Sequence, residues 1–369
     1  MDKFRDCFTQ DEINQLLSSI LEPHFQEIHT YPIADGGEGS LDFFRQLGWR
    51  EISILTAGAD CQERTSIIMQ SPDSQSIAIE LAEIAGKKHA PATLSGWDAS
   101  SLGLGITLRE AATFNPAQIL ICLGGSASSD GGLGVFQGLD IAVVDQNSHE
   151  VTFGLDGVKN ARLVNKKELS KIRELFSEIE IKILVDTKAQ LTGNPNSISM
   201  YGEQKGLNRF QRVKATFYFK KWARILQEMN NNFNPTMAGT GAAGGCSAAL
   251  QAIFNATLVS GAEYFSNLSG ISNQINSQSI VITGEGRVDA STLTGKAIMP
   301  VIDLAIRNNA QLVVVAGIVD SSTKAHIQIL APNAIFFDIS HFAPNKEYSM
   351  THATEILTEN FPKELELLK

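Results

Sequence analysis

Short apolar runs alternate with helix-like segments along most of the chain. Apolar residues recur at helical spacing from Ile13 to Leu21, directly after Thr9 and Glu12, which form a capping box. Aliphatic runs bounded by turn residues predict strands at residues 27–34, 52–55, 65–69, 76–81, 118–123, 181–186, 279–283, 312–316 and 334–337. Further helices are expected at about residues 104–113, 135–139, 217–229, 248–253 and 295–306.

Strands that alternate with helices predict the α/β class. Turn residues at 71–74 separate two of the early strands, so residues 52–81 are expected to form an antiparallel meander. Residues 145–163 show no clear period. A chain of 369 residues is long enough for two domains.

Glycine-rich loops interrupt this pattern four times. They are residues 34–40 (ADGGEGS), 123–134 (LGGSASSDGGLG), 239–245 (GTGAAGG) and 283–289 (TGEGRVD). Because glycine has no Cβ, its backbone amide can approach a ligand closely. In the second loop these amides, three serine hydroxyls and the start of the next helix predict an anion site. The alternative is a tight structural turn.

Carboxylates and cations accompany the loops. The carboxylates at expected strand ends are Asp35, Glu38, Asp130, Asp186, Glu285 and Asp289, and the cations inside motifs are Arg5, Lys205, Arg287 and Lys296. Phosphoryl transfer needs Mg²⁺, a residue that orients the attacking hydroxyl, and cations that offset phosphate charge. Plainer roles stay open: helix caps for Asp130 and Asp289, a turn for Asp186, a surface pair for Glu285 with Arg287, and solvated lysines for Lys205 and Lys296.

Composition narrows the class of protein. The formal net charge of -10 argues against nucleic acid or an anionic membrane as a partner. The four cysteines lie far apart, which fits a reducing cytoplasm and gives no zinc motif. We find no signal peptide and no apolar run of the ~20 residues that a membrane span needs, so a cytoplasmic location is expected. The histidines fall in no motif, and neither G-x-x-x-x-G-K-[ST] nor G-x-S-x-G occurs.

The four loops together resemble the motif set of the bacterial-type (type I) glycerate kinase family. That family carries ADGGEG, GGSA-x-x-DGG, GAGAAGG and GEGR-hydrophobic-D loops in this order and at this spacing. Residues 201–206 (YGEQKG) also resemble its G-P-Q-K-G element, with Glu203 in place of the proline. The resemblance covers nearly the whole chain.

This resemblance implies two α/β domains with an active-site cleft between them. One is a discontinuous Rossmann-like domain, residues 1–90 and 280–369, and the other is inserted, residues 91–279. The implied reaction moves the γ-phosphoryl group of ATP, with Mg²⁺, to a hydroxyl of D-glycerate. The expected product is phosphoglycerate, with the 2-phosphate favoured over the 3-phosphate. A homo-oligomer stays open.

The resemblance also implies roles for individual residues. Asp186 is expected to orient the substrate hydroxyl as a base, while Arg5, Lys205 and Arg287 hold the carboxylate and phosphates. Asp130 and Asp289 are the predicted metal ligands. The predicted substrate- or nucleotide-binding residues are Asp35, Gly36, Gly37, Glu38, Gly124, Gly125, Ser126, Asp130, Gly241, Gly284, Glu285, Arg287 and Lys296.

The chain departs from the family pattern in several places. Ser129 replaces an asparagine, Lys188-Ala189 replaces Asn-Pro, and Leu102 stands where the family has arginine. Arg5 stands in place of a lysine, and the strand that precedes this segment in the family has no counterpart before Asp2. A missing first strand predicts unpaired backbone along residues 30–34 and lower stability.

Two other functions therefore stay open. One is a non-catalytic or weakly active kinase homologue that binds a carboxylate or nucleotide. The other is a nicotinamide-dependent oxidoreductase, although no loop gives a clean G-x-G-x-x-G with an acidic residue at the expected distance.

Overall fold

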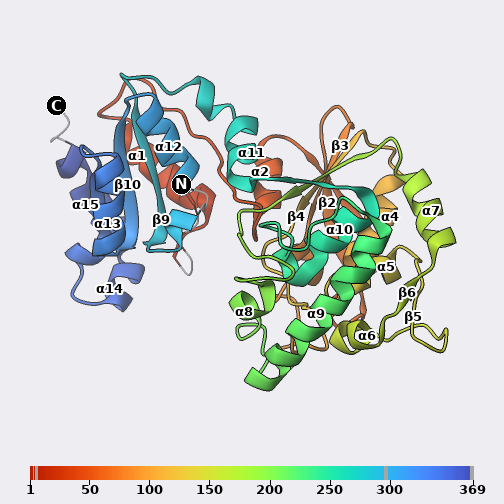
Figure 1. Cartoon of the computed structure of the whole chain (residues 1–369). Helices are drawn as coiled ribbons and strands as arrows, with labels where there is room; N and C mark the ends of the chain where they lie inside the picture. Colours follow the sequence, from red (N-terminus) through yellow and green to blue (C-terminus); the bar gives the residue numbers. More distant parts are fainter. Residues whose placement is uncertain (3, 5–6, 295–297, 366–369) are drawn as a thin grey trace. The chain divides into compact units, whose positions relative to one another are not determined.

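The computed structural model describes the chain except residues 3, 5–6, 295–297 and 366–369 (Figure 1). Contacts divide it into two compact units: a larger one, residues 36–261, and a smaller one that combines residues 1–35 with 262–369. These boundaries differ from the expected ones, because residues 36–90 lie in the larger unit. The strands of that segment join the larger unit's sheet through β3, which pairs with β4.

The larger unit is built on a mixed sheet of order β1-β2-β3-β4-β7-β8. The first three strands form the predicted antiparallel meander, and β3, β4, β7 and β8 run parallel. The strands are β1 (Arg50–Ala57), β2 (Glu63–Gln70), β3 (Ser76–Glu80), β4 (Gln118–Cys122), β7 (Glu180–Leu184) and β8 (Thr257–Val259). Because β3, β4, β7 and β8 are parallel, the loops that follow them emerge at one edge, where α/β sheets bind ligands.

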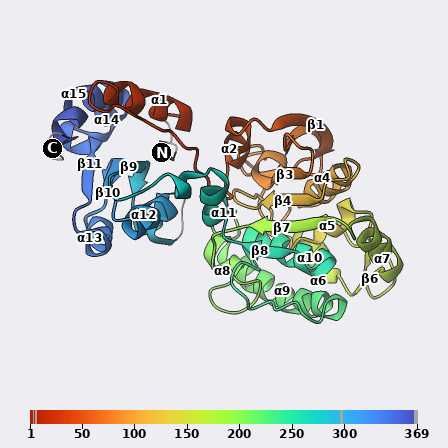
Figure 2. The same ribbon diagram turned by 90° about the horizontal axis from the view of Figure 1, so that it is seen from above.

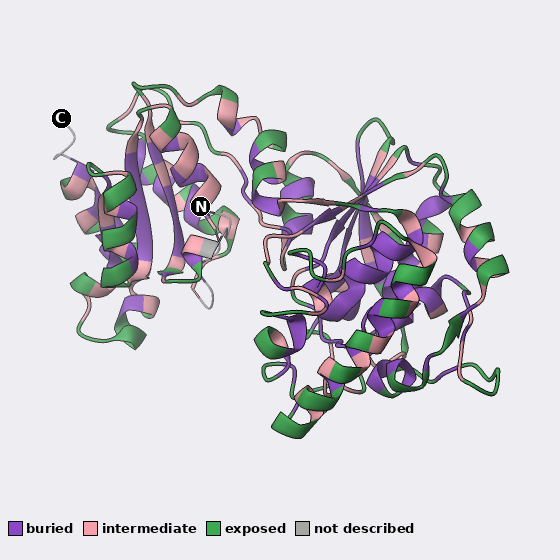
Figure 3. Ribbon diagram, viewed as in Figure 1, coloured by how far each residue is buried: buried purple, intermediate pink, exposed green. Residues whose placement is uncertain are grey.

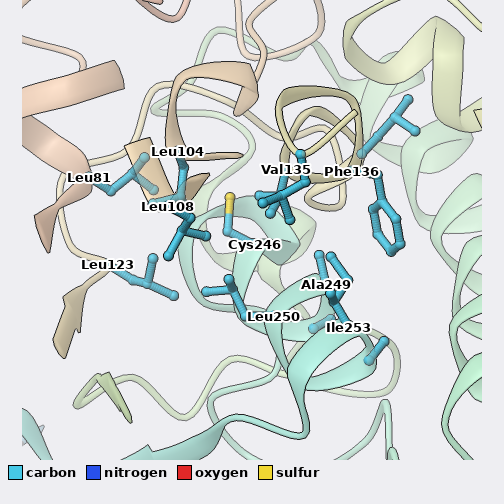
Figure 4. Close-up of a cluster of buried hydrophobic side chains, with 14 of the residues drawn as sticks. Leu81, Leu104, Leu108, Leu123, Val135, Phe136, Cys246, Ala249, Leu250 and Ile253 are labelled. Atoms are coloured by element: carbon cyan, nitrogen blue, oxygen red, sulfur yellow. The ribbon is translucent and has the colours of Figure 1, made fainter. Parts of the chain in front are cut away.

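Helices cover this sheet and supply most of the larger unit's core. Figure 4 shows Leu104 and Leu108 of α4, Val135 and Phe136 of α5, and Leu250 of α10 in one buried cluster. The helices are α2 (Ser40–Gln46), α3 (Leu81–Ala85), α4 (Leu102–Ala112), α5 (Leu133–Gly138), α6 (Gly154–Asn160), α7 (Lys166–Leu175), α8 (Ser197–Tyr201), α9 (Arg209–Met229), α10 (Cys246–Phe254) and the 3₁₀ turn η1 (Ala242–Gly245). A separate two-stranded antiparallel sheet, β5 (Val143–Val144) with β6 (Leu163–Val164), stands at the two ends of the stretch without a clear period, and α6 lies between its strands in sequence.

The smaller unit has a parallel sheet of order β11-β10-β9: β9 (Ile280–Val288), β10 (Gln311–Val319) and β11 (Ile335–Asp338). Figure 2 shows α1 and α15 on one face of this sheet and α12 and α13 on the other, and the strands between them are largely buried (Figure 3). The helices are α1 (Gln10–Leu21), α11 (Gly261–Leu268), α12 (Ile298–Arg307), α13 (Ser321–Leu330), α14 (Lys346–Thr351) and α15 (Ala353–Leu365), with the turns η2 (Ile271–Asn273), η3 (Thr292–Thr294) and η4 (Ile339–Phe342). The capping box of Thr9 and Glu12 is confirmed at the start of α1.

Two predicted elements are wrong. Residues 27–34 form no strand, because no described strand lies beside them to pair with their backbone. The expected fourth loop is instead part of β9, since Gly284 and Glu285 pair with Val315 and Ala316 of β10. In addition, α9 begins earlier than predicted, after a capping box of Asn208 and Gln211.

The structure also shows whether any helix could span a membrane and whether the cysteines form disulfides. None of the helices in the described part of the chain is both long enough and apolar enough to cross a membrane. No disulfide joins Cys7, Cys61, Cys122 or Cys246.

Candidate functional site

Three of the four glycine-rich loops meet in the larger unit. The Gly124 amide donates to the Gly36 carbonyl over 2.9 Å, and the Gly131 amide donates to the Gly244 carbonyl over 2.9 Å. These bonds join residues 36–40, 123–134 and 239–245 into one assembly, which we call the glycine block. The block gathers the predicted residues Gly36, Gly37, Glu38, Gly124, Gly125, Ser126, Asp130 and Gly241.

The close approach within the block requires glycine. A Cβ on Gly124 would lie 2.3 Å from the Cα of Gly37, and a Cβ on Gly245 would lie 2.6 Å from the Cα of Gly131. Side chains cannot occupy such positions without displacing a backbone. Gly125 adds a second requirement, because its φ of 75° lies in the left-handed region.

Asp130 holds the second loop in shape. Its side chain is completely buried, and Oδ2 accepts from the Ser101 amide at 2.7 Å and the Ser101 hydroxyl at 2.8 Å. The amides of Gly132 and Gly134 donate to Oδ1 at 3.2 Å and Oδ2 at 3.1 Å. Both oxygens are therefore occupied, which favours a structural role in the loop over metal binding, although Gly132 and not Asp130 is the N-cap residue of α5.

Lys205 lies beneath the same loop and is 8% exposed. Its Nζ donates to the Ser126 hydroxyl at 2.8 Å and to the Ser128 carbonyl at 2.6 Å. Burial lowers the pKa of Lys205 to about 8, while the nearby Cys246 thiol and Asp130 carboxylate oppose that shift. The solvated-lysine alternative is therefore wrong, and Lys205 places a buried positive charge directly behind the loop.

Glu80 supports the first loop, and the sequence analysis missed this role. The side chain is 4% exposed at the end of β3, where Oε1 accepts from the Gly39 amide at 2.9 Å and Oε2 from the Leu41 amide at 3.0 Å. It thereby caps the start of α2. A carboxylate at the end of a predicted strand was the available signal, but Glu80 stands outside every glycine-rich loop.

Asp186 lies just after β7 and is half-buried. Its Oδ1 accepts from the Ser260 hydroxyl at 2.8 Å. The amides of Gly239 and Gly241 both donate to the Ala189 carbonyl at 3.0 Å, so the third loop packs on the segment that follows Asp186. Asp186 and the glycine block thus belong to the same edge of the larger unit's sheet.

The remaining predicted residues belong to the smaller unit or fall outside the described residues. Asp35, Gly284, Glu285, Arg287 and Asp289 belong to the smaller unit. Glu285 is buried and accepts from the Thr292 hydroxyl at 2.6 Å, whereas the exposed Arg287 lies 3.5 Å from Asp289 and not against Glu285. Arg5 and Lys296 fall outside the described residues, so their roles stay predictions.

The two predicted metal ligands differ in their surroundings. Asp130 and Asp289 lie in different units, and Asp289 Oδ1 accepts from the Ser291 amide at 2.9 Å. Within the described part of the chain, no group of three or more His, Cys, Asp or Glu side chains is placed to hold a metal ion.

Comparisons with known proteins identify the family of the chain. The model of the glycerate kinase family matches residues 1–367. The chain is 27% identical over 320 residues to the glycerate 2-kinase of Escherichia coli (strain K12), covering 86% of this chain and 83% of that one. It is 26% identical over 303 residues to a glycerate kinase of Neisseria meningitidis serogroup B, covering 80% and 78%.

A solved structure has the same fold. The crystal structure of putative glycerate kinase 2 from Salmonella typhimurium LT2 superposes with a TM-score of 0.79, covers 99% of this chain and 96% of that chain, and is 23% identical. The family match spans nearly every residue. It therefore favours a kinase over the nicotinamide-dependent oxidoreductase that the sequence left open. The chain belongs to the glycerate kinase family and is a kinase.

Proposed function

We propose that this kinase transfers the γ-phosphoryl group of ATP to a hydroxyl of D-glycerate and releases 2-phosphoglycerate. The observation that carries the proposal is the glycine block beside Asp186, in a chain of the glycerate kinase family. The named relative from Escherichia coli, a glycerate 2-kinase, supports the choice of the 2-phosphate.

The proposed division of labour follows from the geometry. Several amides of the glycine block already donate within the larger unit, as those of Gly124, Gly131 and Gly132 do. The amides of Gly125 and Ser126 have no acceptor among the described residues, so they are the ones that can donate to phosphate oxygens. Lys205 acts from behind the loop: it fixes Ser126 and the Ser128 carbonyl and adds positive charge where phosphates would bind. Arg5, Arg287 and Lys296 stay predicted ligands of the carboxylate and phosphates.

Asp186 is the proposed base. The substrate hydroxyl oxygen forms a bond to the γ-phosphorus, the bond between that phosphorus and the bridging oxygen of ADP breaks, and the hydroxyl proton passes to the Asp186 carboxylate. The Ser260 hydroxyl donates to Oδ1 and so holds the carboxylate in one orientation. Ser260 is a positioning residue in this scheme.

Mg²⁺ bound together with ATP would supply positive charge that offsets the charge of the phosphates. Asp130 does not fit as its ligand, because both carboxylate oxygens already accept hydrogen bonds in a completely buried position. We derive no step through the metal.

The reaction itself tests the proposal. Purified protein with Mg-ATP and D-glycerate should yield a phosphomonoester that phosphorus NMR identifies as 2-phosphoglycerate. Product with the phosphate on the 3-hydroxyl would correct the position. Ligand-induced stabilisation by ATP or glycerate without any product would instead support the non-catalytic homologue.

We expect the affinity for ATP to fall several-fold between pH 7 and pH 9. Lys205, with its pKa lowered to about 8, is protonated at pH 7 and neutral at pH 9, so its attraction for phosphates disappears over this range. Lys205→Met keeps a long side chain and removes the charge. This variant should bind ATP weakly at both pH values, which isothermal titration calorimetry can measure.

Lys87→Met is the matched control for this titration. Lys87 is exposed, and its Nζ donates to the backbone carbonyl of Gln204 at 2.6 Å. Gln204 directly precedes Lys205 in the sequence, so the control removes a charge close to the same segment. The control should keep the pH dependence of the unmodified chain. An unchanged pH dependence in Lys205→Met would show that another group causes it.

A further inference from the structure

Helix α9 of the larger unit carries a row of exposed apolar side chains. Phe210, Val213 and Phe217 are 80%, 69% and 56% exposed. Their spacing of three and then four residues puts all three on one face of the helix. Single exposed apolar side chains are ordinary on protein surfaces, but several that adjoin on one face are typical of a binding surface. We call these three side chains the α9 stripe.

The opposite face of α9 holds the helix in the fold. Phe219 and Trp222 are buried, and Trp222 Nε1 donates to the Gly131 carbonyl of the glycine block at 2.8 Å. Figure 3 shows exposed and buried residues on different faces of this helix. The position of α9 in the larger unit therefore depends on its inner face, and the α9 stripe is free to contact another molecule.

Positive charge accompanies the α9 stripe. The helix has six arginine or lysine residues and a single acidic residue, Glu228, near its end. Within the described part of the chain only Arg212 has an acidic partner, because its Nη1 lies 2.8 Å from Glu203 Oε2. The other cations of the helix are Arg209, Lys214, Lys220, Lys221 and Arg224.

Two of these lysines lie directly beside the stripe. Lys214 follows Phe210 by four residues, which is about one helical turn. Lys221 follows Phe217 by the same spacing, and its Nζ lies 5.2 Å from the centre of the Phe217 ring. The border of the apolar surface therefore attracts negative charge.

This charge pattern selects among possible partners. The whole chain has a net charge of -10, so it repels extended polyanions such as nucleic acid or an anionic membrane. A second copy that docks through the same helix would place the cations of one α9 against identical cations, which is unfavourable. A short acidic segment avoids both costs, because it contacts α9 and little else of the chain.

We propose that the α9 stripe docks an acidic amphipathic helix of another protein. Apolar residues of that helix, at positions i, i+3 and i+7, cover the stripe, and its carboxylates pair with the flanking lysines. The 21 residues of α9 span ~31 Å, which gives room for a partner helix of about three heptads. The apolar contact is small, so the complex is transient, with a Kd on the order of 10–100 μM.

Two designed peptides of about three heptads test the proposal with the full chain. Both carry leucine at positions a and d, and one has glutamate and the other lysine at positions e and g. Fluorescence anisotropy of the labelled peptides measures binding. The glutamate peptide should bind with a Kd on the order of 10–100 μM, and the lysine peptide should bind at least ~10-fold more weakly.

Variants of the chain separate the apolar contact from the charge. Phe210→Ser with Phe217→Ser should weaken binding of the glutamate peptide at least ~10-fold and leave thermal unfolding and kinase activity unchanged. Ile329→Ser is the matched control, because Ile329 is 78% exposed on α13 in the smaller unit. It should leave peptide binding intact. Lys214→Glu with Lys221→Glu should shift the preference toward the lysine peptide.

Several results would overturn the proposal. They are no binding of the glutamate peptide, equal affinity for the two peptides, or binding that persists in Phe210→Ser with Phe217→Ser. A dimer of the unmodified chain in analytical ultracentrifugation, converted to a monomer by the same double variant, would show that a second copy covers the stripe. Flotation with vesicles of phosphatidylserine and phosphatidylcholine, lost in that variant, would show that the partner is a membrane surface.

Discussion

Replacing Asp186 by asparagine is expected to lower turnover ~10²–10⁴-fold, the usual cost of removing a positioned base. Asparagine keeps the size of the side chain and can still contact Ser260, so the fold should be unchanged. The affinity for ATP should change only a few-fold. The expected signature is a fall in kcat with little change in KM for ATP. Steady-state kinetics with both substrates varied measures it.

Ser260→Ala is the comparison variant. It removes the hydroxyl that donates to Asp186 Oδ1 and leaves the carboxylate in place. Turnover should fall less than in Asp186→Asn, because the carboxylate is still present but is no longer held in one orientation by the Ser260 hydroxyl. Turnover of Asp186→Asn within a few-fold of the unmodified chain would falsify the role of Asp186 as base.

Replacing Gly125 by alanine is expected to weaken ATP binding roughly 10–100-fold, because small displacements of a positioning group carry costs of this size. The new Cβ would lie 2.8 Å from the Cβ of Ala82, so the loop must move away from α3. The left-handed φ adds a strain of about 1–2 kcal/mol for any residue with a Cβ. Calorimetric titration with ATP measures the affinity.

Gly48→Ala isolates the steric contribution. Gly48 has a φ of 77°, close to the 75° of Gly125, but a Cβ there would meet no atom within 4 Å. Both variants therefore carry a similar backbone strain, which thermal unfolding measures as a loss of stability. Only Gly125→Ala displaces the glycine block. Equal ATP affinity in the two variants would mean that the loop after β4 does not bind the nucleotide.

Much of the fold follows from local pattern. The run at residues 118–123 is short, aliphatic and followed by glycines, and it forms β4 in the centre of the larger sheet. Residues 27–34 carry fewer aliphatic side chains and lead into a glycine-rich loop in the same way, but they form no strand, because a strand also needs a neighbour that accepts and donates backbone hydrogen bonds. Residues 283–288 show the reverse case: their glycines suggested a loop, but pairing with β10 makes them a strand.

The site was predictable in part for the same reason. Motifs identified the loops, but the contacts between them join backbone atoms, as between Gly36 and Gly124, which no side-chain pattern encodes. Asp130 gained its structural role from Ser101, which lies 29 residues away in sequence. Lys205 likewise reaches Ser126 across 79 residues. Partners at such separations become visible only once the chain is folded.

The discontinuity of the smaller unit has a consequence for synthesis of the protein. Residues 36–261 form a continuous segment and can fold as soon as they leave the ribosome. Residues 1–35 are made first and must wait until residues 36–369 have been translated, which takes roughly 15–70 s at about 5–20 residues per second. During that interval the apolar face of α1, with Ile13 and Leu17, has neither its sheet nor α15 to cover it. Nascent chains of this protein therefore expose the apolar face of α1, which chaperones can bind, until α15 has been translated.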